Sequence, residues 1–252
     1  MKRYTLLILM AIFAMTGKAQ DNCEVWFEQA NAAYNVGNYD SAMILYERIV
    51  AQDLESVPLY FNMGNTCYKM REYPMAIYYY EKALKLDPSN DEVQVNLAIA
   101  NRAIVDKIEP VPQSFFAKGW NSLRACLSGD QWAWCSVVLF ALLLFSAFLF
   151  LRSRRVGTRK LGFFMGIVFV LAFALSVVFA AQLKLASGRQ DQAIVMTPTV
   201  NVKSSPSEAS VDLFVLHEGT KVNILETADG WSKIKIANGS VGWMTTDSML
   251  TF

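Results

Sequence analysis

The sequence holds little of the side-chain chemistry on which enzymes and metalloproteins depend. There is one histidine, His217, and the four cysteines form neither a CxxC pair nor a Cys/His cluster with the spacing of a zinc site. The chain has no P-loop, GxGxxG, HExxH or EF-hand loop, and a Ser-His-Asp triad could draw only on that histidine. We therefore expect a non-enzymatic protein with no catalytic, cofactor-binding or metal-binding residues.

Charged residues are also scarce. They make up 18% of the 252 residues, and the formal net charge of +1 gives no support for nucleic-acid binding. Hydrophobic residues make up 54%, which is high for a soluble protein and indicates membrane segments.

The first apolar stretch, residues 1–19, has the pattern of a signal peptide. Lys2 and Arg3 precede an apolar run, and Gly17 and Ala19 supply the small residues that favour cleavage after Ala19. The alternative is an uncleaved anchor, and either outcome places the next segment outside the cytoplasm.

Two further stretches, residues 131–151 and 161–183, carry no charge over 21 and 23 residues. As helices each would be about 30 Å long, which matches the hydrocarbon thickness of a bilayer. Between them, residues 152–160 hold five positive charges and no negative one, so the positive-inside rule places this loop in the cytoplasm. The parts before and after the two spans then face the periplasm.

Residues 110–130 precede the first span, and residues 184–192 form a linker after the second. In the first of these, Phe115, Phe116 and Trp120 recur at roughly helical spacing, with Lys118 away from the apolar face. We interpret this segment as an interfacial helix on the membrane, with a plain structured linker as the alternative.

Residues 20–109 contain an internal repeat with a period of 34 residues. The aligned pairs are Trp26 and Tyr60, Tyr34 and Tyr68, Tyr39 and Tyr73, Ala42 and Ala76, and Tyr46 and Tyr80. The second copy resembles a tetratricopeptide repeat (TPR), with Gly64 and Ala76 small where paired helices cross and Pro88 ending the second helix. The first copy is degenerate, and a helix from Asp91 to about Ile108 is expected to cap the stack.

The resemblance to TPR proteins implies that a partner protein binds the concave face of the stack. That face would offer Phe27, Asn31, Tyr34, Phe61, Asn62, Asn65, Tyr68, Lys69, Asn96, Ile99 and Arg102. Phe27 stands where the carboxylate clamp of some TPR proteins has lysine, so a terminal-carboxylate site is not carried over. The alternative is that these residues are repeat consensus without a ligand.

Residues 193–252 show short β-patterned runs separated by turn residues. Segments 200–206, 217–222 and 230–234, together with Gly242-Trp243-Met244, resemble a bacterial SH3-like domain. The resemblance implies that Trp231 and Trp243 brace a small barrel core, and that the domain binds peptides or cell-wall material.

The order of these parts is also informative. A signal, TPR-like repeats, the stretch NLAIANRAIVDKIEPVP at 96–112, two spans and an SH3-like tail together resemble the BatE family of the aerotolerance (Bat) operons. The resemblance implies a membrane complex with von Willebrand A-type Bat proteins, linked to oxidative-stress tolerance or envelope integrity.

The sequence thus predicts a multidomain protein of the bacterial inner membrane, made of an α-helical TPR-like solenoid, a two-helix transmembrane hairpin and a small all-β SH3-like barrel. Its predicted function is a periplasmic scaffold. One alternative is a cell-wall sensor or tether that binds peptidoglycan through the barrel. Another is a thiol-redox protein that uses Cys126 and Cys135.

Overall fold

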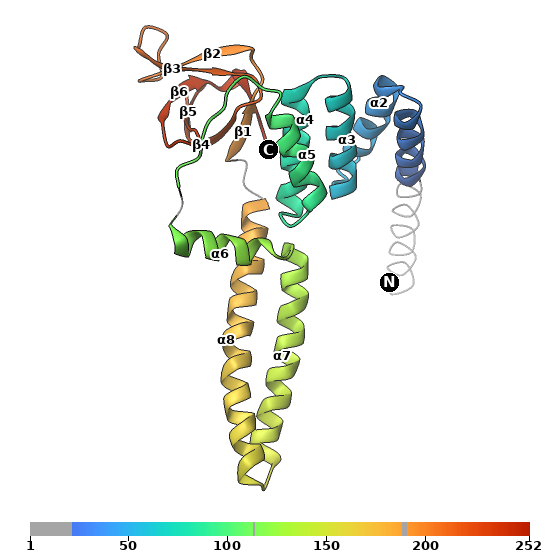
Figure 1. Ribbon diagram of the computed structural model, residues 1–252, viewed down its shortest axis with the longest axis vertical. Helices are drawn as coiled ribbons and strands as arrows, with labels where there is room; N and C mark the ends of the chain where they lie inside the picture. The colour runs from blue at the N-terminus through green and yellow to red at the C-terminus, as the bar shows by residue number, and fades with distance from the viewer. Residues whose placement is uncertain (1–21, 113, 188–190) are drawn as a thin grey trace, which may run out of the picture.

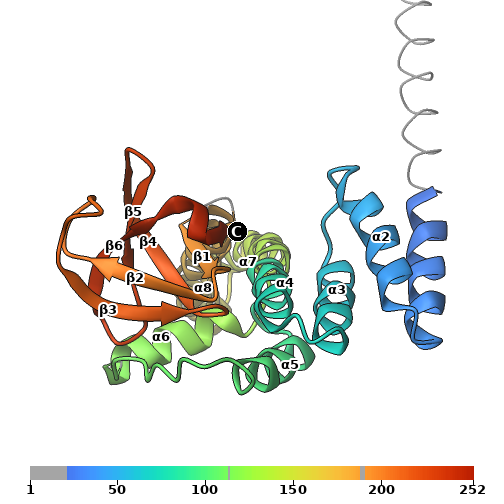
Figure 2. The same ribbon diagram turned by 90° about the horizontal axis from the view of Figure 1, so that it is seen from above.

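The computed structural model describes residues 22–112, 114–187 and 191–252, so the predicted signal peptide at 1–19 lies outside the described residues. A helical repeat region and a β-barrel domain lie side by side at one end of a long two-helix hairpin (Figures 1 and 2). This combination of a helical solenoid, two long apolar helices and a small all-β domain confirms the predicted fold class.

The described part of the repeat region is built from five helices. They are a helix over 22–35, α2 (Tyr39–Val50), α3 (Val57–Lys69), α4 (Tyr73–Leu86) and α5 (Asp91–Asn101). Asn38, Ser56 and Asn90 each accept a hydrogen bond from a backbone N–H three residues later and so cap α2, α3 and α5.

Close helix crossing within the second repeat depends on Gly64, as predicted. A Cβ atom at this position would lie 2.5 Å from the Tyr80 ring, so only glycine allows α3 and α4 to approach this closely. Ala30 holds the equivalent place in the first repeat and is fully buried, with Tyr46 as the counterpart of Tyr80.

The predicted capping helix is shorter than expected. It was expected to reach about Ile108, but α5 ends at Asn101. The chain then extends along the barrel, where Asp106 accepts hydrogen bonds from His217 and Thr220 and Ile108 packs against the barrel core. These contacts with a distant part of the chain stabilise an extended conformation after Asn101, where the sequence predicted that the helix would continue.

The hairpin consists of α7 (Gly129–Arg152) and α8 (Val156–Ser187), both long and apolar enough to cross a membrane. The turn between them, residues 153–155, is shorter than the predicted loop at 152–160. Arg159 and Lys160 lie in the first turns of α8, because both are good helix formers and the segment contains no proline. The α8 helix also continues four residues past the predicted end of the span at Leu183.

Small residues bring α7 and α8 together. The Ser146 hydroxyl donates to the Gly162 carbonyl at 2.5 Å, and the Ser176 hydroxyl donates to the Trp132 carbonyl at 2.7 Å. A Cβ atom on Gly162 would lie 2.9 Å from the Phe150 backbone nitrogen. Gly162 is therefore used for close packing within the hairpin, in the way that small residues bring membrane helices together.

We expect Gly162→Leu to separate the lower halves of α7 and α8. Backbone atoms of Phe150 occupy the space that the new side chain needs, so overpacking should cost at least about 1–3 kcal/mol. The measurement is the disulfide yield of a Phe150→Cys/Phe163→Cys pair, whose ring centroids lie 6.1 Å apart at the level of Gly162, in a background without the native cysteines. Gly157→Leu is the matched control because its Cβ would meet open space, and equal yields in both variants would contradict the packing role.

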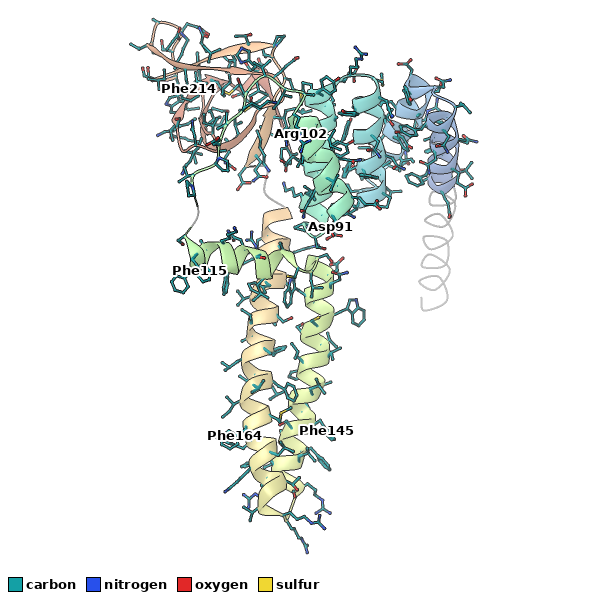
Figure 3. All side chains as sticks on the ribbon, in the orientation of Figure 1. Asp91, Arg102, Phe115, Phe145, Phe164 and Phe214 are labelled. Atoms are coloured by element: carbon teal, nitrogen blue, oxygen red, sulfur yellow. The ribbon has the colours of Figure 1, made fainter. Side chains whose placement is uncertain are left out.

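A short helix, α6 (Phe115–Ala125), crosses the upper end of the hairpin at a large angle (Figure 1). Ser114 caps it, and the Trp120 ring packs edge-on against Phe179 of α8 with centroids 4.8 Å apart. Phe115 and Phe116 are 86% and 85% exposed, and Figure 3 shows Phe115 at the end of α6 farther from the hairpin.

The barrel is a seven-stranded antiparallel sheet among the described residues, in the order β3-β2-β6-β5-β4-β1-β7. Its elements are β1 (Gln192–Val195), β2 (Thr199–Lys203), β3 (Asp212–His217), β4 (Lys221–Ala228), β5 (Trp231–Lys235), β6 (Val241–Thr245), a 3₁₀ turn η1 (Thr246–Ser248) and β7 (Met249–Thr251). Buried aliphatic residues such as Val202, Ile234 and Met244 fill its core.

The expectation that Trp231 and Trp243 brace this core is wrong. Both side chains are only partly buried and lie outside the core cluster, and the Lys233 ammonium lies 5.9 Å from the Trp243 ring centroid. Side chains alternate in direction along each strand, and on β5 and β6 it is Ser232, Ile234 and Met244 that are buried.

One strand belongs to two hydrophobic cores. In β1, Ala193 and Val195 point into the barrel, whereas Ile194 packs into the core of the repeat region. Phe252 follows β7 and joins the same repeat core, with its ring 5.9 Å from Tyr78 of α4. The barrel therefore packs directly against α4.

Candidate functional site

The concave face of the repeats carries a ladder of asparagines that are fixed by tyrosines. Asn31 Oδ1 accepts from the Tyr46 hydroxyl at 2.6 Å and from Asn62 Nδ2 at 2.8 Å. One repeat later, Asn65 Oδ1 accepts from the Tyr80 hydroxyl at 2.7 Å and from Asn96 Nδ2 at 2.8 Å. The two arrangements are the same interaction displaced by one repeat.

This ladder has a defined polarity. Because Oδ1 of Asn31 and of Asn65 already accepts two hydrogen bonds, the amide nitrogens of these residues remain as donors. In Asn62 and Asn96 the nitrogen is used and the carbonyl oxygen remains as an acceptor. The ladder therefore offers donors and acceptors in alternation, which matches the N–H and C=O groups of a peptide backbone.

The tyrosine hydroxyls that bind the ladder do not lose their protons. Burial raises the pKa of Tyr46 to about 12, and burial is also the largest cause that raises the pKa of Tyr80. Both hydroxyls therefore stay protonated and donate to the asparagines across the physiological pH range.

A cavity of about 290 Å³ opens at the first step of the ladder. Its lining residues are Asn31, Tyr34, Asn35, Tyr46, Asn62 and Asn65. Four of these six were predicted from the sequence. The periodicity marked Tyr46 as a repeat position but did not place it in the groove. Asn35 was not predicted, although it lies one repeat before Lys69, a predicted groove residue.

The predicted aromatic residues border the same surface. Phe27 packs against Tyr46 with ring centroids 6.0 Å apart, and Phe61 packs against Tyr80 at 6.2 Å. Tyr34 and Tyr68 each pack against a tyrosine of the following helix, at 5.4 and 5.5 Å. These contacts repeat every 34 residues, so the groove wall is as regular as the ladder.

Lys69, Ile99 and Arg102 are exposed and lie outside this hydrogen-bonded arrangement. Arg102 terminates α5 as its C-cap, at the end of the stack that faces the barrel (Figure 3). The structure thus brings the predicted asparagines and aromatics together in the groove. Lys69, Ile99 and Arg102 make no hydrogen bond to the ladder.

The joint between repeats and barrel is a second polar cluster that sequence periodicity does not indicate. Asp106 accepts hydrogen bonds from the His217 backbone N–H at 2.7 Å and the Thr220 hydroxyl at 2.7 Å, and it pairs with His217 Nδ1 at 2.8 Å. Lys221 of β4 forms an ion pair with Glu81 of α4 at 2.6 Å. His217, the one histidine of the sequence, thus connects two domains.

The cysteines give no geometric support to the redox alternative. All four are free, including Cys126 and Cys135, the pair that this alternative uses. Cys126 is exposed and Cys135 is partly exposed, whereas Cys23 and Cys67 are buried in the repeats. Burial, with smaller contributions from Glu72 and Glu47, raises the pKa of the Cys67 thiol to about 12. A thiol protonated to this extent is a poor nucleophile. Within the described residues no group of three or more His, Cys, Asp or Glu is placed to hold a metal ion.

Two segments of the chain match known families. Residues 57–90, which contain α3 and α4, match the tetratricopeptide repeat, and residues 198–249 match the bacterial SH3 domain. Both are non-catalytic interaction modules. No curated protein matches the chain. The TPR match begins and ends in the second copy, where the sequence also places the more regular repeat.

Proposed function

We propose that this protein is a membrane-anchored scaffold that docks a partner protein in the groove of its repeats. The observation that carries the proposal is the asparagine ladder, which offers backbone-like donors and acceptors beside aromatic contacts that repeat with the same period. An extended peptide segment is the ligand that such a surface fits, because every residue of a peptide supplies one donor and one acceptor.

The proposed anchor is the hairpin of α7 and α8, in the inner membrane of a bacterium. The repeats and the barrel lie at the same end of the hairpin, and the short basic turn lies at the other (Figure 1). With that turn in the cytoplasm, the groove and the barrel face the periplasm. The signal peptide at 1–19 would deliver the repeats there, and α6 would lie at the membrane surface.

A Bat-type membrane complex is the finer form of this proposal. It draws on the resemblance of the sequence to the BatE family, and it makes von Willebrand A-type Bat proteins the partners to look for. The order of domains in the structure is compatible with that resemblance, and the link to oxidative-stress tolerance or envelope integrity follows from the same source.

The test is co-purification of the tagged full-length protein in mild detergent, with bound proteins identified by mass spectrometry. We expect Tyr34→Ala/Tyr68→Ala to lose the partner because it removes one groove aromatic from each of the two repeats. Ile44→Ala/Glu47→Ala, at two exposed positions of α2 outside the groove, is the matched control. A partner that both double variants retain would contradict groove docking.

A second candidate function is peptidoglycan binding through the barrel, which the match to the bacterial SH3 domain favours. The barrel should be tested within the full-length protein, because an isolated barrel would expose Ile194 and Phe252, which pack into the repeats. If the full-length protein pellets with purified peptidoglycan and the groove variant does so equally, the wall-tether function is supported.

A further inference from the structure

A cavity of about 420 Å³ lies at the turn end of the hairpin, at the opposite end from the repeats and the barrel (Figure 1). Phe150, near the end of α7, forms one wall, and the other lining residues come from the first turns of α8. They are Val156, Arg159, Lys160, Phe163 and Phe164. Their spacing is that of a single helix face, so the cavity is built on one side of α8.

This face changes from charged to aromatic along α8. Arg159 and Lys160 directly precede the uncharged stretch at 161–183, and Phe163 and Phe164 lie within that stretch. Both rings are largely exposed, and Figure 3 shows Phe164 in the half of the hairpin nearer the turn. With α7 and α8 across a membrane, the two cations lie at the level of the phospholipid headgroups and the rings lie in the adjoining hydrocarbon.

The two cations have no anion to neutralise them. The sequence holds no aspartate or glutamate between Asp130 and Asp191, and these two residues lie at the opposite end of the hairpin, in the first turn of α7 and after α8. None of the ion pairs among the described residues includes a cation of segment 152–160. The five positive charges of this segment are therefore available to an anion from outside the protein.

One contact fixes the position of Arg159 and leaves its charge unmatched. The Cζ atom of Arg159 lies 5.5 Å from the centroid of the Phe150 ring, which is a cation–π contact between α8 and α7. This contact holds the guanidinium against the wall of the cavity. Because the ring carries no net charge, the guanidinium keeps its attraction for an anion.

We propose that this cavity binds the phosphate of an anionic phospholipid from the cytoplasmic leaflet. The planar guanidinium of Arg159 binds two phosphate oxygens, and Lys160 adds a second positive charge. The acyl chains lie against the exposed rings of Phe163 and Phe164. The inference rests on the membrane anchoring in the proposed function and is independent of the groove. A lipid bound there would fix the depth of the hairpin in the bilayer.

The test uses the full-length protein in nanodiscs of phosphatidylcholine that contain a minor fraction of phosphatidylglycerol. Native mass spectrometry then counts the phosphatidylglycerol molecules that remain bound after release. We expect Arg159→Gln to reduce this retention about tenfold, which corresponds to the loss of one charged contact. Arg159→Lys should show an intermediate loss, because an ammonium group keeps the charge without the planar fork. Lys160→Gln should also reduce the retention.

Arg154→Gln is the matched control. It removes the same charge from the same end of the hairpin, but Arg154 does not line the cavity. If this variant loses as much lipid as Arg159→Gln, general surface charge is the cause and the site is refuted. Equal retention by all variants also refutes the site. Displacement of the lipid by inorganic phosphate would assign the cavity to a free anion and overturn the proposal.

The same samples separate this result from the proposed function. Both leaflets of a nanodisc have the same composition, so lipid retention does not depend on which side of the membrane the turn faces. Partner capture should be unchanged in every variant, because the groove lies at the other end of the hairpin (Figure 1). Retention that depends on Arg159 without any captured partner would refute groove docking and support the lipid site. A protein that does not enter nanodiscs would refute the anchoring and the lipid site together.

Discussion

Replacing Phe252 with alanine is expected to detach the barrel from the repeats. The side chain is only 5% exposed and lies between the two domains, edge-on to Tyr78 and near the ammonium groups of Lys85 and Lys221, which lie 5.8 and 5.5 Å from its ring centroid. Truncation of a buried phenylalanine costs about 3–5 kcal/mol, because apolar contacts are lost and a cavity remains. This loss should weaken the joint, which the contacts of Ile194 and the ion pair of Lys221 with Glu81 also stabilise.

Hydrogen–deuterium exchange of the full-length protein in detergent is the measurement. We expect faster exchange in β1, β7 and α4, with little change in β2 and β3, which lie at the far edge of the sheet. Leu250→Ala is the matched control because Leu250 is on β7 but is 38% exposed. Unchanged exchange in α4 would show that Phe252 does not stabilise the repeats.

Replacing Asp106 with asparagine is the second change with a large expected effect. The carboxylate accepts from the His217 backbone N–H and the Thr220 hydroxyl with one oxygen and meets the His217 ring with the other. Hydrogen bonds to a charged group contribute about 1.5–3 kcal/mol each, and the asparagine amide can replace only part of this set. We expect a loss of about 2–4 kcal/mol at neutral pH.

The effect of this substitution should depend on pH in a defined direction. Burial alone would raise the pKa of Asp106, but hydrogen bonds from His217 and Thr220 outweigh it and lower the pKa below its ordinary value of 3.8. A carboxyl group with a lowered pKa in the folded protein stabilises it fully above the unfolded value, and this contribution disappears as the pH falls through the folded value.

The measurement is the thermal midpoint of the wild type and of Asp106→Asn, followed by intrinsic fluorescence from neutral pH downward. The difference between the two proteins should shrink progressively as the pH falls from about 5 through 3.8 and below, because Asp106 is protonated first in the unfolded and then in the folded protein. Glu109→Gln removes an exposed carboxyl group from the same linker and should show no such difference. If the thermal midpoints of the wild type and the variant differ by the same amount at all pH values, the effect does not depend on the charge of Asp106.

The sequence predicted most of the local structure because local structure follows from periodicity. The 34-residue repeat located the helices of the second TPR, and the uncharged stretches located α7 and α8. It also identified the four asparagines of the ladder, since residues one repeat apart occupy equivalent positions. Their hydrogen-bond partners Tyr46 and Tyr80 were aligned as repeat positions, but helix packing was needed to bring them to the groove.

Tertiary structure alone decided how the parts are joined. The alternating pattern of β1 places Ala193 and Val195 on the face opposite Ile194. It does not show that Ile194 packs into a second hydrophobic core, that of the repeats. In the same way, α5 has no sequence signal for its end at Asn101, because the extended segment after it is held by His217 and Thr220, more than a hundred residues later. Periodicity reports which face of an element is apolar, whereas the surface that covers that face is chosen by long-range packing.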